Sequence, residues 1–243
     1  MSKVDNVIPK EKWVFDKDVA DCFENMLERS IPQYQVMRDS VSNCLKYFLD
    51  LRDIVKSGYS ILDIGCSDGL MIDYLIKNLD GMGYYTGIDV SEPMLNKAKS
   101  RLDNYIKDHR VSLHNVDLRY SFPNSLYSAI TSILSIQFTP IEYRHKILSN
   151  IYKNLVSGGC FIMVEKVLGN STDINNIMVK SYYSKKAENG YTKEDIERKR
   201  LSLEGVLVPI TSDWNIELLK NTGFKEVDVF WRWMNFVGYI AIK

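Results

Sequence analysis

Residues 61–69, Ile-Leu-Asp-Ile-Gly-Cys-Ser-Asp-Gly, are the stretch of this chain that decides its fold. An apolar run ends in an acid and a glycine-rich turn, and a second apolar run, 84–88, ends in Asp89. This order predicts a strand, a tight turn, a helix and a second strand with an acid at its tip. Gly65 and Gly69 should let the backbone approach a ligand, because neither has a Cβ. Asp89 is placed to accept both hydroxyls of a ribose, so the pattern predicts a nucleoside site.

The residues of this turn indicate which of the known nucleotide-binding loops it resembles. The turn lacks the G-x-G-x-x-G pattern that holds a pyrophosphate and the lysine of a P-loop. G-x-S-x-G also spells the nucleophile elbow of hydrolases, but no histidine follows at a late strand end. Asp63, ahead of the turn, would repel phosphate and suits a cationic amino acid; the alternative is that it orients the loop through backbone N–H groups without touching the ligand. The turn resembles the S-adenosyl-L-methionine signature of class I methyltransferase-fold proteins; the alternative is an ordinary turn without a ligand.

Composition limits the class of protein. The chain has 243 residues, of which 45% are hydrophobic, enough for one full core. Lys+Arg and Asp+Glu number 31 each, so we expect no direct nucleic-acid binding and no overall attraction to anionic membranes; the alternative is a local basic patch. Four cysteines without C-x-x-C spacing and three histidines favour a reduced protein without a metal site. We expect no signal peptide and no membrane span, and hence a cytoplasmic protein.

The periodicity predicts an α/β fold with a doubly wound, seven-stranded, mostly parallel, Rossmann-like sheet. Five strands are expected at 59–64, 84–88, 111–115, 127–135 and 160–165, and a closing antiparallel pair at 225–231 and 235–242. Residues 1–55 should form an N-terminal helical cap, and 167–210 a lysine-rich helical insertion before the last helix. The whole chain, 1–243, then forms a single domain.

The ends of the expected strands would hold the ligand. Gly65 and Ser67 would line its methionine portion. Asp117 and Leu118, at the tip of the third strand, would hold the adenine, the carboxylate accepting from the exocyclic amine. The segment 133–137 should face the sulfonium, and it lacks the polar and aromatic residues that align an amine for methylation. The alternative for each acid is a strand-end or turn residue without a ligand.

Several short segments, in order along almost the whole chain, match one family of proteins. They are Val14-Phe15-Asp16, Arg29-Ser30-Ile31-Pro32-Gln33-Tyr34, Asp63-Ile64-Gly65-Cys66-Ser67, Ile136-Gln137-Phe138, Gly158-Gly159, Glu165-Lys166, Asn189-Gly190-Tyr191, Lys199-Arg200 and Asn235-Phe236. The chain resembles the carboxy-S-adenosyl-L-methionine synthases of bacterial wobble-uridine tRNA modification. The glycine loop is shared by many methyltransferases, whereas the Arg-Ser-x-Pro-x-Tyr and Lys-Arg segments are more specific.

The resemblance implies a homodimeric transferase that converts S-adenosyl-L-methionine and prephenate to carboxy-S-adenosyl-L-methionine and phenylpyruvate. Prephenate would lose CO2 and hydroxide, the hydroxide would take a proton from the sulfonium methyl, and the ylide would capture the CO2. Arg200 matches the family's carboxylate-binding arginine, a role that suits a guanidinium fork; otherwise it is a solvated helix charge. Tyr34 and Cys66 match cofactor-binding positions, although Tyr34 could instead pack on the core.

Two positions depart from the family's pattern. Val90 and Ile133 stand where the family usually has asparagine, after the ribose-binding acid and after the fourth strand. Both are still expected to contact the cofactor, Val90 by packing on the adenine. The change at Ile133 favours an alternative function, a methyltransferase acting on a small molecule or a tRNA nucleoside. A third class, a cofactor-binding regulatory subunit, is disfavoured by the intact loop and Asp89.

Overall fold

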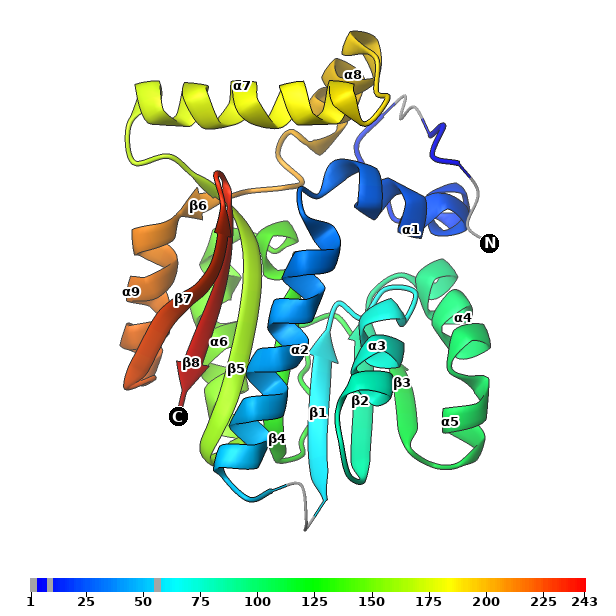
Figure 1. Cartoon of the computed structure of the whole chain (residues 1–243), viewed down its shortest axis with the longest axis vertical. Coiled ribbons are helices and arrows are strands. Elements are labelled where there is room, and N and C mark those ends of the chain that lie inside the picture. The colour runs from blue at the N-terminus through cyan, green and yellow to red at the C-terminus, as the bar shows by residue number, and fades with distance from the viewer. Residues whose placement is uncertain (1–3, 8–10, 55–57) are drawn as a thin grey trace.

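The glycine-rich turn lies at the carboxyl edge of a sheet with strand order β3-β2-β1-β4-β5-β8-β7 (Figure 1). The structure, a computed structural model, describes residues 4–7, 11–54 and 58–243. The strands are β1 (Tyr59–Ile64), β2 (Gly83–Asp89), β3 (Val111–Asn115), β4 (Tyr127–Ile133), β5 (Leu155–Leu168), β6 (Ile210–Thr211), β7 (Glu226–Trp233) and β8 (Phe236–Ile242). β8 runs antiparallel to β5 and to β7, whereas the other pairs are parallel.

The predicted sheet is therefore confirmed, including the closing antiparallel pair. The number of strands is eight in the described residues, not seven, because the short β6 pairs with the end of β5. β5 begins at Leu155 and not at 160, since 157–159 continue the strand across a register shift opposite β4. β4 ends at Ile133, before the predicted 135, because Leu134 takes a left-handed φ of 57°.

Helices cover both faces of the sheet. They are α1 (Lys17–Ser30), α2 (Tyr34–Leu51), α3 (Leu70–Asn78), α4 (Glu92–Arg101), α5 (Asp103–Lys107), the 3₁₀ turn η1 (Ile136–Phe138), α6 (Ile141–Asn154), α7 (Thr172–Glu188), α8 (Lys193–Leu203) and α9 (Ser212–Thr222). Ile61 and Ile162 pack in one core with α2 and α3, whereas their neighbours Leu62 and Phe161 pack in a second core with α6 and α9. Successive residues of a strand point to opposite faces, so the strands are apolar on both sides.

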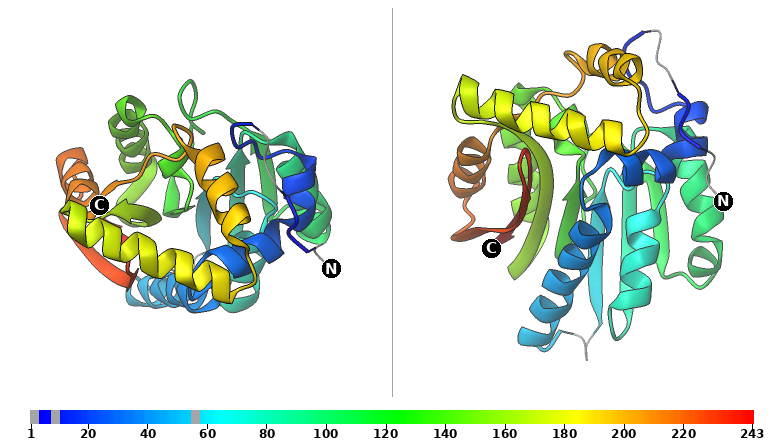
Figure 2. Two further views of the ribbon diagram at one scale, coloured as in Figure 1. Left: turned by 90° about the horizontal axis from the view of Figure 1, so that it is seen from above. Right: turned by 45° about the horizontal axis from the view of Figure 1, so that its top comes forward.

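The segments before β1 and after β5 lie over the carboxyl edge of the sheet. Figure 2 shows α7 and α8 crossing above this edge, close to α1. α7 and α8 occupy the predicted insertion, each with a side-chain cap. The cap predicted for 1–55 covers the edge only in its first part, because α2 packs along the sheet with Met37, Val41 and Leu45 fully buried. Residues 1–3, 8–10 and 55 of that range lie outside the described residues.

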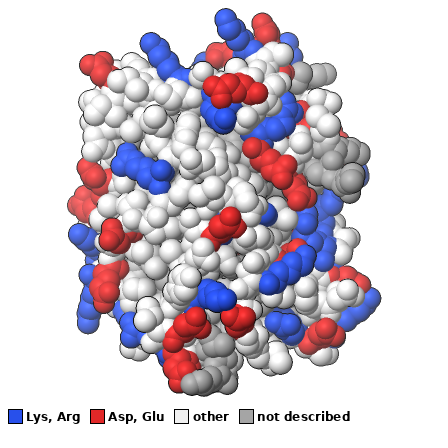
Figure 3. Space-filling view, viewed as in Figure 1, with Lys and Arg blue, Asp and Glu red and all other residues white. Residues whose placement is uncertain are grey.

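The surface carries charges of both signs. On the face in Figure 3, basic and acidic residues are interspersed around a largely uncharged centre. This agrees with the net charge of zero. Among the described helices, none is both long enough and apolar enough to cross a bilayer.

Candidate active site

A cavity of about 280 Å³ lies between the carboxyl edge of the sheet and the covering helices. Its walls come from the turn after β1, the tips of β2, β4 and β5, and from α1, α2, α7 and α8. Trp13, Phe15, Phe23 and Phe138 line one side, and the Phe15 and Phe138 rings meet edge-to-face with centroids 5.2 Å apart. The predicted nucleoside site therefore lies in a mostly apolar, partly enclosed space.

The tip of β2 holds the turn after β1 in place. The N–H groups of Gly65 and Cys66 donate to the carbonyl of Ile88 at 2.8 and 3.0 Å. Ser67 takes a left-handed φ of 50°, and its N–H donates to Asp89 Oδ2 at 3.0 Å. A Cβ on Gly65 would lie 2.1 Å from the Oγ of Ser135, so this position requires glycine. Gly65, Cys66 and Ser67 all line the cavity, as predicted.

Gly69 has a different reason to be glycine. It lies at the N-cap of α3 with a φ of 77° and does not line the cavity. A Cβ here would lie 2.8 Å from Leu102 Cδ1 and 3.2 Å from the Ala98 Cβ. The prediction that Gly69 lets the backbone approach a ligand is wrong, because the position is needed for the packing of α4 against the turn.

Asp89 lies at the tip of β2 and lines the cavity. Its Oδ1 accepts from the N–H of Ser91 at 2.8 Å and its Oδ2 from the N–H of Ser67. Burial raises the pKa of this carboxyl, and the backbone N–H groups oppose the rise. Each oxygen can accept a further hydrogen bond, which is what the two hydroxyls of a ribose would donate. Val90, the next residue, also lines the cavity and is 59% exposed.

The structure places only one of the two residues predicted to bind adenine on the cavity wall. Leu118 lines the cavity, but Asp117 does not. The Asp117 carboxylate pairs with Arg119, whose Nε and Nη2 donate at 3.0 and 2.6 Å, and this guanidinium lowers the pKa of Asp117. The structure therefore supports the turn-residue alternative for Asp117, because its oxygens are used along the chain and not in the cavity.

Asp63 is an almost completely buried carboxyl at the end of β1 that lines the cavity. Thr131 Oγ1 donates to Asp63 Oδ1 at 2.6 Å. Burial raises the pKa of Asp63 to about 7, with a smaller contribution from Asp89. A cationic ligand would stabilise its charged form, which agrees with the expected preference for a cationic amino acid.

The beginning of α2 places two side chains, one turn apart, on the cavity wall. Tyr34 lines the cavity, as the resemblance implied. Arg38, one turn further along, also lines it, with its guanidinium 5.1 Å from the centroid of the Tyr34 ring. The Arg38 Nε is buried and has no hydrogen-bond partner among the described residues. Arg38 was not predicted, and its spacing of four residues from Tyr34 is the signal that sequence could have offered. Ile133 lines the cavity as an apolar residue.

Arg200 lies outside the cavity, on the exposed side of α8. Its Nε and Nη2 donate to Glu197 at 2.9 and 2.7 Å. Successive residues of a helix point about 100° apart, and on α8 this step leaves Lys199 buried and Arg200 exposed. Lys199 is the one that lines the cavity. The structure therefore does not bring Arg200 to the ligand, and its carboxylate-binding role stays a prediction.

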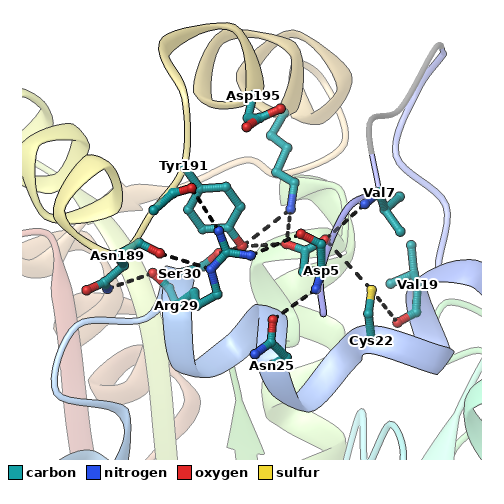
Figure 4. Close-up of polar contacts among 12 residues, drawn as sticks. Asp5, Val7, Val19, Cys22, Asn25, Arg29, Ser30, Asn189, Tyr191 and Asp195 are labelled. Carbon is teal, nitrogen blue, oxygen red and sulfur yellow. Dashed lines mark hydrogen bonds and ion pairs between the residues drawn. The ribbon is translucent and has the colours of Figure 1, made fainter. Parts of the chain in front are cut away.

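The covering helices are joined to the N-terminal segment by buried Asp5 (Figure 4). The Asp5 carboxylate accepts from the Lys199 ammonium and from the Tyr191 hydroxyl, and its N–H donates to Asn25 Oδ1 at 2.9 Å. Arg29 Nη1 donates to the Asp5 carbonyl at 3.0 Å. These contacts join several of the family-like segments and fix α8 against α1.

Two further lysines line the cavity, Lys166 at the end of β5 and Lys186 on α7. Burial lowers the pKa of Lys166 to about 8 and that of Lys186 to about 7. Lys166 and Lys199 belong to segments that match the family, but no sequence signal marked Lys186. Sequence reasoning missed the cationic part of the cavity because its members come from three separate elements.

The doubly wound sheet, the turn held by β2 and the acid at the tip of β2 define a protein of the class I methyltransferase fold. Residues 61–159 match the family model described as a methyltransferase domain. The chain belongs to the carboxy-S-adenosyl-L-methionine synthase family. It is 37% identical to the carboxy-S-adenosyl-L-methionine synthase of Nautilia profundicola, over 99% of each chain. It is 35% identical to the enzyme of that name from Methylococcus capsulatus, over 94% of this chain and 93% of that one.

Solved structures show the same fold at much lower identity. The plantazolicin methyltransferase BpumL, in complex with S-adenosyl-L-homocysteine (SAH) and a triazolic desmethylPZN analogue, has a TM-score of 0.66 and 17% identity, over 91% of this chain and 89% of that one. Human N-acetylserotonin methyltransferase in complex with S-adenosyl-L-methionine (SAM) has a TM-score of 0.62 and 13% identity, over 93% of this chain and 55% of that one.

Proposed function

We propose that this protein is a carboxy-S-adenosyl-L-methionine synthase that uses prephenate as its second substrate. The observation that carries the proposal is the charge distribution of the cavity. Asp63 and Asp89 line it at the tips of β1 and β2, whereas Lys166 and Lys186 line it at the tip of β5 and on α7. β5 lies two strands from β1, about 10 Å away. Such a site suits a cationic sulfonium beside an anionic partner.

The residues divide the work of binding SAM. Asp89 would bind the ribose hydroxyls, and Val90 and Leu118 would pack on the adenine. Asp63 would stabilise the cationic amino-acid portion, and Arg38, with its unpartnered Nε, would bind the amino-acid carboxylate.

Transfer of a carboxyl group also requires that CO2 stay beside its acceptor. The aromatic wall of Trp13, Phe15 and Phe138, and the covering helices fixed through Asp5, would exclude water and restrict the escape of CO2. The cavity would thus supply orientation and containment, and the reaction further requires a cation for the new carboxylate.

Mass spectrometry of protein incubated with SAM and prephenate tests the proposal. The expected product is heavier than SAM by one carboxyl group in place of a hydrogen, and phenylpyruvate should appear in equal amount. Consumption of SAM to SAH, with prephenate unchanged, would contradict the proposal. With a small-molecule or tRNA acceptor also supplied to take the methyl group, that outcome would support the alternative, a methyltransferase acting on such an acceptor, which the apolar Ile133 favours.

We further propose that Arg200 binds the new carboxylate, and that the protein is a cytoplasmic homodimer whose product serves wobble-uridine tRNA modification. The resemblance supports these points. Arg200→Ala should weaken the carboxylated cofactor at least tenfold more than SAM, because a guanidinium–carboxylate pair is lost only with the former. Direct titration of both ligands measures this. Equal losses for the two would remove Arg200 from the role.

A further inference from the structure

Lys166 and Lys186 face the cavity without an acidic partner. Among the described residues, no carboxylate forms an ion pair with either ammonium. Their neighbours are aromatic: the Lys166 Nζ lies 4.8 Å from the centroid of the Tyr182 ring, and the Lys186 Nζ lies 5.5 Å from Tyr182 and 4.9 Å from Tyr191. Lys186 is only 6% exposed. Buried lysines are rarely unpaired, so this arrangement needs a reason.

Two other cations near the cavity, Lys199 and Arg101, already have acidic partners. The Lys199 ammonium donates to Asp5, whose side chain is fully buried. Arg101 pairs with Asp68 at 2.8 Å. Lys186 is repelled by Lys199 and Lys166, and the attraction of Asp5 and Asp195 is weaker. Within the described residues, the wall around Tyr182 therefore holds two ammonium groups that form no ion pair with a carboxylate.

We propose that Lys166 and Lys186 bind the two carboxylates of a dianionic cosubstrate, with the Tyr182 ring packed against its apolar framework. Tyr182 lines the cavity, and the centroid of its ring lies within 6 Å of both ammonium groups. This inference rests on the proposed function, in which prephenate is the dianion.

The charge balance of the reaction fits two fixed cations. The bond between the ring carbon and its carboxylate breaks and releases CO2, and the hydroxide that leaves the ring takes a proton from the sulfonium methyl as water. The methyl carbon then bonds to CO2. Two carboxylates of the dianion become one on phenylpyruvate and one on the carboxymethyl group. The two ammonium groups can therefore neutralise the dianion until its ring carboxylate leaves as CO2, after which the new carboxylate is available to Arg200.

The protonation of the lysines supports the same site. Burial lowers the pKa of Lys166 to about 8 and that of Lys186 to about 7. A bound dianion would raise both values, so binding should take up protons near pH 8. The groups that face these lysines are Lys199, Asp5, Asp195, Tyr182 and Tyr191.

Binding of unreactive probes to the full chain saturated with SAH tests the inference separately from catalysis. Phenylsuccinate is a dianion, and 3-phenylpropionate is a monoanion with the same ring. Calorimetric titration at pH 7 should show tighter binding of phenylsuccinate. Lys166→Met and Lys186→Met should each weaken phenylsuccinate about ten- to a hundredfold, the usual loss for one charge-assisted hydrogen bond. The SAH affinity should change no more than about twofold, since neither lysine is expected to touch the nucleoside.

Two further variants control for charge and for folding. Lys180→Met removes an exposed lysine from the same helix as Lys186 and should leave phenylsuccinate binding unchanged. Lys186→Arg keeps the charge and should retain much of the affinity that Lys186→Met loses. Unchanged phenylsuccinate binding in both methionine variants, or equal binding of the two probes to the unmodified chain, would overturn the inference. Prephenate turnover is measured apart: a chain that binds phenylsuccinate through these lysines but does not convert prephenate would refute the proposed function alone.

Discussion

Replacing the buried Lys186 by methionine should stabilise the protein while weakening anion binding. The cause is the low pKa of about 7 in the folded chain, against the ordinary value of 10.5 that the unfolded chain would have. Between these two pH values the folded state binds fewer protons than the unfolded state, so Lys186 lowers the free energy of unfolding. Methionine has a similar length and no charge to bury.

The magnitude follows from the two pKa values. Proton linkage gives a cost of about 4 kcal/mol at pH 7 and about 2 kcal/mol at pH 9 for keeping this lysine in the cavity wall. The variant loses the contacts of the ammonium with Tyr182 and Tyr191, each worth about 0.5–2 kcal/mol. The net gain at pH 7 is then between zero and about 3 kcal/mol, and each kcal/mol raises the Tm by about 2–4 °C in a chain of this size.

Calorimetry of the ligand-free protein at several pH values measures the effect. The cost of the lysine is complete below pH 7 and disappears as the pH rises towards 10.5, so the gain in Tm should shrink from pH 6 to pH 9. Lys180→Met, on the exposed side of α7, should change Tm little at either pH. A gain that does not depend on pH, or a loss of stability at pH 6, would refute the reasoning.

Two other substitutions test the glycine turn and the acid at the tip of β2. Gly69→Ala should lower the free energy of unfolding by about 2 kcal/mol, because its φ is 77° and its Cβ would meet α4. Gly205→Ala is the control: its φ of 76° is similar, but the atom nearest to its Cβ lies 3.9 Å away. Denaturant unfolding should therefore show a smaller loss of stability for Gly205→Ala than for Gly69→Ala. Asp89→Asn should weaken SAH about ten- to a hundredfold by titration, since one acceptor oxygen and the charge are lost. Asp117→Asn, outside the cavity, should change SAH affinity less than about threefold, and equal effects of the two would restore Asp117 to the site.

The fold and the nucleoside half of the site were predictable because their signals are local. β1 and β3 begin and end at the predicted residues, and Asp89 lies at the predicted strand tip. An apolar run followed by glycine and an acid predicts both where the strand ends and which residue lies at its tip. The same local pattern was misleading at Gly69, where a contact with α4 decides the residue, and at Asp117, where a neighbour two residues away takes up the carboxylate.

The anion-binding half of the site, which is formed by lysines, was not predictable, because no local sequence pattern indicates it. Lys166, Lys186 and Lys199 come from β5, α7 and α8, and they meet only when the insertion folds back over the sheet. Whether a lysine on α8 is a partner of the ligand or of the protein depends on Asp5, which is 194 residues away.

The orientation of α8 determines which of its two adjacent basic residues, Lys199 or Arg200, faces the cavity. The pair Lys199-Arg200 matches the family as a unit, but only Lys199 faces inward, and there it is neutralised by Asp5. Arg200 points outward to Glu197. The cations that line the described cavity without a carboxylate partner are Lys166 and Lys186, together with Arg38 on α2. A motif of adjacent basic residues locates the helix that closes the site, whereas the unpaired lysines on other elements determine which charge the site accepts.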